Sequence, residues 1–195
     1  MAPNRYTWIL LLGLILIAML ASPAYSKVGE IGQIKGSGVL ERDGDIVIEG
    51  DAGVGVLSMD EAVTANGTMR IDFVDETRVE LTEQSRLVID EFVYDPNTKK
   101  GKLSLSAKLG TVKYASGQIA KTSRQDISIK TPTATIGVRG TDFSMTIDEL
   151  GGSTIILLPS CDENGNCLVG EITVESAAGQ VILNQAFQAT VVTVP

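Results

Sequence analysis

The sequence predicts an all-β fold of many short, mainly antiparallel strands in a sandwich-like or solenoid-like domain. Apolar residues alternate with polar ones over short stretches, as in half-buried strands. Gly, Asn and Asp interrupt these stretches about every 8–12 residues, which is typical of sandwiches and barrels. No long helical pattern follows residue 26, and the 195 residues suffice for one domain with a sizeable core.

The first half of the chain reads as strands joined by tight turns. Asp43-Gly44 and Asn66-Gly67 each lie beside an apolar alternation, and both pairs are typical of hairpin turns. The alternation changes phase at Asp90-Glu91, so we expect a β-bulge or corner there. An exposed loop is expected over residues 95–101, and Gly110 is expected to end the strand that follows it.

The most particular stretch is IKTPTATIGVRGTDF, residues 129–143. Pro132 has no N–H to donate, so it marks a strand end, an edge or a bulge. The alternation of apolar residues then moves from even to odd numbers within Arg139-Gly140-Thr141. Such a slip requires a bulge or turn, and Gly137 and Gly140 supply the conformational freedom for it. The segment therefore predicts a corner.

Arg139 has two interpretations at this corner. Its guanidinium carries five donors in a rigid fork, which suits carbonyls and carboxylates. We expect Asp142, Asp90 or backbone carbonyls to hold it in place, in which case removing it costs roughly 3–5 kcal/mol. The alternative is a cation that binds an anionic ligand or a carboxylate of a partner.

The N-terminal segment predicts export. One cation, Arg5, precedes an uncharged run of about 14 residues from Trp8 to Ala21, shorter than the roughly 20 residues of a membrane-spanning helix. Small residues follow: Ala24 and Ser26 fit cleavage before Lys27, and Ser22 and Ala24 fit cleavage before Tyr25. We therefore expect residues 1–26 to form a cleaved signal-peptide helix and residues 27–195 to form one domain, periplasmic or secreted. An uncleaved anchor is the alternative.

The two cysteines, Cys161 and Cys167, flank the sequence DENGN. An oxidising compartment would join them, and Asn164-Gly165 between them is typical of a hairpin turn. We expect a disulfide that staples a hairpin tip. Calcium binding by the loop oxygens is a weaker interpretation, because a distant bidentate Glu is lacking.

Composition argues against several function classes. There is no His, which removes Ser-His-Asp and Cys-His nucleophiles and imidazole metal sites. Acidic residues such as Asp72 alternate with core positions and are expected on a solvated face. A net charge of −8 disfavours nucleic acid, which needs clustered cations. We expect no catalytic residues, no metal and no cofactor.

The stretch IKTPTATIGVRGTDFSM resembles the hallmark of the FecR domain family. FVDETRVELTEQSRLVIDEFVYDP, KLSLSAKLGTVKYASGQIAK and GDAGVGVLSMD are similar to other parts of that domain, so the resemblance covers about residues 28–148 and leaves a β extension over 149–195. The combination of motifs in this order is more specific than any one alone. The residues that carry the hallmark are Thr131, Pro132, Ala134, Gly137, Arg139, Gly140, Thr141 and Asp142.

The resemblance implies an extracytoplasmic all-β domain, without known catalysis, from a Gram-negative bacterium. Founding members of the family add a cytoplasmic anti-sigma segment and one transmembrane helix, and receive a signal from an outer-membrane transporter. Only seven residues precede the apolar run here, so we do not expect an anti-sigma segment.

We expect the chain to contact another envelope protein through a sheet edge or corner loop. The segment around Pro132 and the final strand, Thr190 to Val194, are the candidate edges. A polysaccharide or peptidoglycan is the alternative partner, and relay of a signal to a separate membrane regulator is a third possibility. Contact with a membrane is expected only through the signal segment before cleavage.

Overall fold

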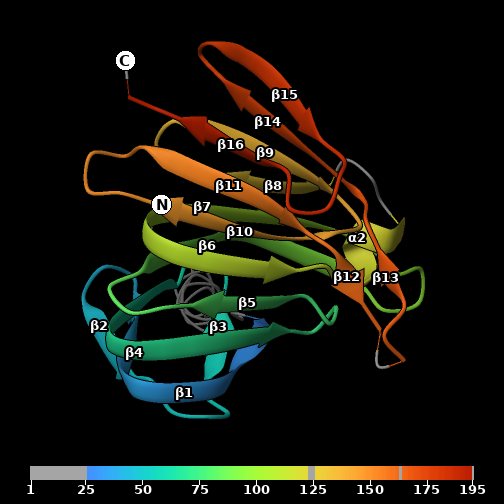
Figure 1. Cartoon of the computed structure of the whole chain (residues 1–195). Helices are drawn as coiled ribbons and strands as arrows, with labels where there is room; N and C mark the ends of the chain where they lie inside the picture. Colours follow the sequence, from blue (N-terminus) through green and yellow to red (C-terminus); the bar gives the residue numbers. More distant parts are fainter. Residues whose placement is uncertain (1–25, 123–125, 163, 195) are drawn as a thin grey trace, which may run out of the picture.

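The computed structural model describes residues 26–122, 126–162 and 164–194 (Figure 1). The predicted signal peptide, residues 1–26, therefore lies outside the described residues except for Ser26. Strands make up 65% of the chain and helix 3%, which confirms the all-β fold. Within the described ranges, we find no helix with both the length and the apolar character that a membrane span requires.

Figure 1 labels the strands and the short helix in chain order. They are β1 (Lys27–Arg42), β2 (Ile46–Glu49), β3 (Gly55–Leu57), β4 (Glu61–Phe73), β5 (Arg78–Leu81), β6 (Arg86–Asp95), β7 (Lys100–Ala115), α2 (Gln118–Thr122), β8 (Ile127–Lys130), β9 (Ala134–Arg139), β10 (Asp142–Ile147), β11 (Ser153–Leu158), β12 (Ser160–Cys161), β13 (Cys167–Leu168), β14 (Glu171–Ser176), β15 (Gly179–Leu183) and β16 (Ala189–Val192).

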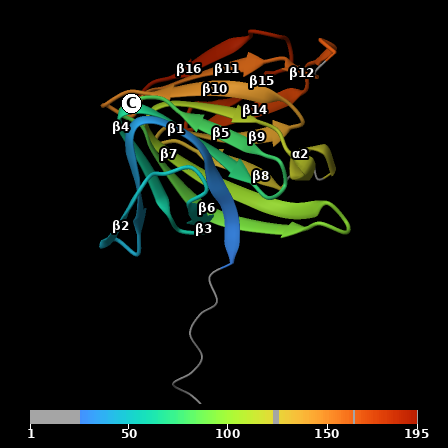
Figure 2. The same cartoon turned by 90° about the horizontal axis from the view of Figure 1, so that it is seen from below.

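One 14-stranded sheet folds back on itself into two layers. Strand β7 belongs to both: its first part, residues 100–109, pairs with β6 and β8, whereas residues 110–115 pair with β5 and β10. Strand β4 divides in the same way between β6 and β5. Figure 2, seen from below, shows β10, β11 and β16 on one side and β6 and β8 on the other.

Each layer ends in one of the last two strands of the chain. One layer runs from β7 through β8, β9 and β14 to β15, and the other runs from β7 through β10 and β11 to β16. Alternate side chains of both layers point between them and form a single apolar core. The fold is thus a two-layer stack in which long strands bend from one layer into the other.

A turn and a strand end that the sequence predicts both prove to lie inside long strands. The predicted hairpin at Asn66-Gly67 is wrong, because β4 passes straight through it. There β1 and β4 approach so closely that a Cβ on Gly67 would lie 2.0 Å from the carbonyl oxygen of Lys35. Gly110 does not end its strand either; with φ +83°, it bends β7 where that strand changes layers.

Other local predictions are confirmed. Asp43-Gly44 forms the β1–β2 hairpin turn, with φ values of +53° and +79° that suit this residue pair. The register between β6 and β7 shifts between Ile89 and Glu91, which is the bulge expected at Asp90-Glu91. The side chain of Asp72 lies on the outer face, where it pairs with Arg70 at 2.9 Å.

Candidate functional site

The hallmark motif begins in a tight turn between β8 and β9. The N–H of Thr131 donates to the Ala134 carbonyl at 2.8 Å, and the N–H of Ala134 donates to the Thr131 hydroxyl at 3.0 Å. Ser153 of the other layer donates its hydroxyl to Thr131 at 2.8 Å. Pro132 lies in this turn, at a strand end as predicted. The segment is not a sheet edge, however, because β9 pairs with both β8 and β14.

The motif ends at the predicted corner, where the chain leaves β9 in one layer and enters β10 in the other. Gly140 has φ +56°. The buried Thr141 donates its hydroxyl to the Leu158 carbonyl at 3.0 Å, and Ser116 donates its N–H to Asp142 at 3.0 Å. Gly137 plays no part in this turn: its φ is not positive, and nothing in the structure explains why it is glycine.

The structure gives Arg139 a different partner from those expected. Its guanidinium donates to Glu171 at 2.8 Å, and the Arg139 side chain is 48% exposed. Asp142 instead accepts from Ser116, and Asp90 accepts from the hydroxyls of Ser104 and Ser106. The expected buried ion pair at the corner is therefore wrong. A surface pair of this kind is worth about 0–1 kcal/mol, well below the 3–5 kcal/mol of a broken buried pair.

Arg139 lines a pocket of about 720 Å³, which we call the Arg139 pocket. Four chain segments build it: the end of α2, the corner, the start of β14 and the stretch after β15. Its lining residues are Ala120, Lys121, Arg139, Gly140, Val169, Gly170, Glu171, Asn184 and Gln185. Sequence reasoning missed Lys121, Glu171, Asn184 and Gln185, because only the β9–β14 pairing and the docking of α2 bring them to Arg139.

A buried carboxylate holds α2 beside this pocket. Asp75, in the β4–β5 turn, is fully buried and accepts hydrogen bonds from the N–H groups of Thr77 and Ile119 and from the Thr77 hydroxyl. Its own carbonyl accepts from the N–H of Gln118, the first residue of α2, at 2.7 Å. These contacts hold the start of α2, the helix that carries Lys121.

A second concave region lies at the C-terminal rim, which we define as β15, β16 and the Pro132-Thr133 turn. In Figure 1 this rim is at the top of the molecule. One groove there, of about 560 Å³, is lined by Pro132, Thr133, Leu150, residues 176–178 and residues 192–194. A smaller one, of about 240 Å³, lies between β15 and β16. The two segments predicted as edges, around Pro132 and at Thr190 to Val194, therefore line the same groove. Of these two, β16 is an edge strand and the Pro132 segment is not.

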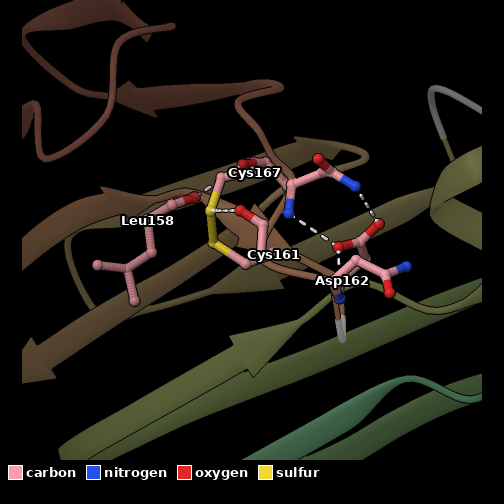
Figure 3. Close-up of a disulfide and its surroundings, with 8 residues drawn as sticks. Leu158, Cys161, Asp162 and Cys167 are labelled. Carbon is pink, nitrogen blue, oxygen red and sulfur yellow. Dashed lines mark hydrogen bonds between the residues drawn. A yellow bond between two sulfur atoms is a disulfide. The ribbon is translucent and has the colours of Figure 1, made fainter.

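The hairpin β12–β13 carries the predicted disulfide (Figure 3). The sulfur atoms of Cys161 and Cys167 are 2.00 Å apart, and both residues are exposed. In the loop, Asp162 accepts the side-chain amide of Asn166 at 3.0 Å and the backbone N–H groups of Asn164 and Asn166; these bonds lower the pKa of Asp162. Its oxygens are thus engaged by the loop itself, and no group of three or more His, Cys, Asp or Glu side chains suited to a metal ion occurs among the described residues.

Comparison with protein families identifies a matching family. The family described as FecR protein matches residues 60–158, just over half of the chain. The matched range contains the whole hallmark motif, the corner and both bent halves of β7. A search of curated proteins found no significant match. The family is known for signalling and regulation and not for enzymatic activity. The residues matched identify the chain as a member of the FecR family.

Proposed function

We propose that this chain is an exported, non-enzymatic envelope protein that binds an extended segment of another envelope protein along β16. Membership of a signalling family supports a role in protein contact. The observation that carries the proposal is the C-terminal rim, where both layers end in strands with one partner each. Strand β15 pairs only with β14 and strand β16 only with β11 within the described part of the chain.

Exposed apolar side chains gather at this rim. Val181 and Ile182 on β15 are 46% and 48% exposed, and Val191 on β16 is 65% exposed. Val181 lies opposite the buried Val174 in the sheet, so it faces the core side and is uncovered only because the layers stop there. A strand added at the rim would cover such side chains and satisfy the free backbone groups, which is the principle of β-strand addition.

The backbone groups available for such a strand can be assigned along β16. Donors and acceptors of successive residues point to opposite sides of a strand. The N–H of Leu157 donates to the Gln188 carbonyl at 2.9 Å, in line with the β11–β16 register. Thr190 and Val192 therefore direct their N–H groups toward β11, whereas Val191 directs its own away from the sheet.

This alternation suggests a specific test. Val191→Pro removes an N–H that faces away from β11, and no hydrogen bond of the ladder to β11 uses that donor. Val191→Thr is the matched control, since it keeps the N–H and a β-branched side chain. A photocrosslinking residue at position 181 would report binding in living cells, and a second at the exposed Lys35 would report background.

We expect position 181 to capture one envelope protein, in a yield that Val191→Pro abolishes and Val191→Thr preserves. Equal yields from both variants would contradict pairing along β16. Capture of glycan alone would support the alternative of a polysaccharide- or peptidoglycan-binding module. Cleavage of residues 1–26 and release from the cytoplasm are checked in the same cells, by N-terminal sequencing of the fractionated protein.

A further inference from the structure

The Arg139 pocket gathers hydrogen-bond donors that the fold does not use. The guanidinium of Arg139 donates to Glu171 through one terminal nitrogen, and its remaining N–H groups have no partner among the residues that the structure describes. Within the described residues, Lys121 forms no ion pair, and the side chains of Asn184 and Gln185 form no hydrogen bond. Two cationic and two carboxamide residues thus line the same pocket.

The charge of the pocket contrasts with that of the protein. Of the described lining residues, Lys121 and Arg139 carry two positive charges and Glu171 one negative charge, so this part of the lining is net positive in a chain of net charge −8. Arginine presents a planar fork that matches a carboxylate with two parallel hydrogen bonds. The salt bridge to Glu171 orients the fork without occupying all of it. The fold therefore holds a pre-positioned cation at an accessible surface.

The rest of the lining defines what should flank the anion. Asn184 and Gln185 each offer an amide N–H₂ and a carbonyl oxygen, which are the complements of an amide group. Ala120 and Val169 add small apolar contacts. The volume of about 720 Å³ is in the range of pockets for small organic ligands. These features favour a ligand that carries a carboxylate next to amides rather than a bare inorganic anion.

We propose that the Arg139 pocket binds a carboxylate whose neighbouring groups are amides. The C-terminus of a peptide and an N-acetylated sugar acid both have this chemistry. Arg139 and Lys121 would bind the carboxylate, and Asn184 and Gln185 would bind the amide beside it. The proposal is independent of strand binding at the C-terminal rim, because the two sites share no lining residue.

Two probe pairs test the proposal by calorimetric titration of the purified protein. The first pair is acetyl-trialanine with a free C-terminal carboxylate and the same peptide with a C-terminal amide. The second pair is N-acetylmuramic acid and N-acetylglucosamine, which lacks the carboxylate-bearing lactyl ether. We expect at least one acid to bind, and its neutral counterpart to bind about tenfold more weakly or not at all, the equivalent of about 1.4 kcal/mol. The acid that binds identifies the source of the carboxylate.

Variants locate the binding site. Arg139→Ala should weaken binding of the acid about tenfold or more, because charge-assisted hydrogen bonds are the strong ones. Arg139→Lys should bind the acid with an affinity between those of the unaltered protein and Arg139→Ala, because lysine keeps the charge but lacks the planar guanidinium. Glu171→Gln should strengthen binding by freeing the guanidinium, which a purely structural role of Arg139 does not predict. Lys35→Ala, an exposed lysine outside the pocket, is the charge-matched control.

Three results would overturn the proposal. They are absence of binding by both acids, equal binding of acid and neutral probes, and unchanged affinity in Arg139→Ala. A thermal melt of each variant excludes unfolding as the cause of a loss, and we expect Arg139→Ala to melt close to the unaltered protein.

Discussion

The ion pair between Arg42 and Asp60 carries the sharpest stability prediction. Asp60 is completely buried and accepts two hydrogen bonds from the Arg42 guanidinium, at 2.7 and 2.8 Å. The side chain of Arg42 is 22% exposed, and it also donates to the Gly55 carbonyl. The pair ties the end of β1 to the turn between β3 and β4. Arg42→Ala would leave a buried carboxylate without its cation.

Removing one partner of a buried pair costs about 3–5 kcal/mol. The N–H of Leu57 still donates to Asp60 at 2.8 Å, so we expect a loss near the lower end, about 3 kcal/mol. For a domain of this size, that loss lowers the melting temperature by about 6–12 °C. Urea unfolding measures it as a lower midpoint with an unchanged slope.

An exposed arginine provides the matched control. Arg78 is 69% exposed and lies 3.7 Å from Asp72, so Arg78→Ala should cost less than about 1 kcal/mol. If Arg42→Ala lost no more stability than Arg78→Ala, burial would not govern the strength of these pairs in this protein, and the reasoning that assigns Arg139 a small structural role would fail with it.

Four further predictions concern stability. The Tyr114 hydroxyl is buried and makes no hydrogen bond within the described structure; burial raises its pKa, although Thr77 and Ser116 lie close enough to it to lower that pKa slightly. Tyr114→Phe should therefore not lose stability and should gain up to about 1 kcal/mol in urea unfolding; a clear loss would show that Thr77 or Ser116 is a hydrogen-bond partner. Gly67→Ala should lower the melting temperature, since its Cβ would collide with a backbone carbonyl in β1; an unchanged melt would contradict the close approach of β1 and β4. Burial raises the pKa of Glu61, but hydrogen bonds from an arginine and a lysine outweigh it and lower the pKa below 4.5. The charged Glu61 carboxylate therefore stabilises the fold above its unfolded pKa, and this stability is lost as the pH falls through the lower folded pKa. In Glu61→Gln the free energy of unfolding should fall less steeply at acid pH. An unchanged dependence of unfolding free energy on pH would contradict this prediction. Replacing Cys161 and Cys167 together by serine should cost about 2 kcal/mol, because the bridge closes a short loop; urea unfolding measures the loss, and a loss as large as about 4 kcal/mol would contradict this.

The alternation of apolar residues determined much of the fold before any tertiary contact. It predicted the strands, the bulge at Asp90-Glu91 and the corner at Arg139-Gly140-Thr141, because a period of two and its slips are local properties of a strand. The cysteine spacing likewise predicted the hairpin staple, since both cysteines and their turn lie within seven residues.

Tertiary structure decided what local patterns could not encode. Asn66-Gly67 has the composition of a turn, yet two long strands approach each other there and need the missing side chain to do so. Gly110 bends β7 because its two halves pair with strands of different layers. Both glycines are required by contacts with residues far away in sequence, so the local pattern predicted a turn at Gly67 and a strand end at Gly110 instead.

The candidate sites show the same division. The motif itself identified Arg139 as unusual, and the resemblance placed it in a signalling family. Only the pairing of β9 with β14 supplied Glu171 as its partner, and only the docking of α2 brought Lys121 to the same pocket. Neither contact can be predicted from the local sequence, because strand order and helix docking depend on the burial of the whole core rather than on neighbouring residues.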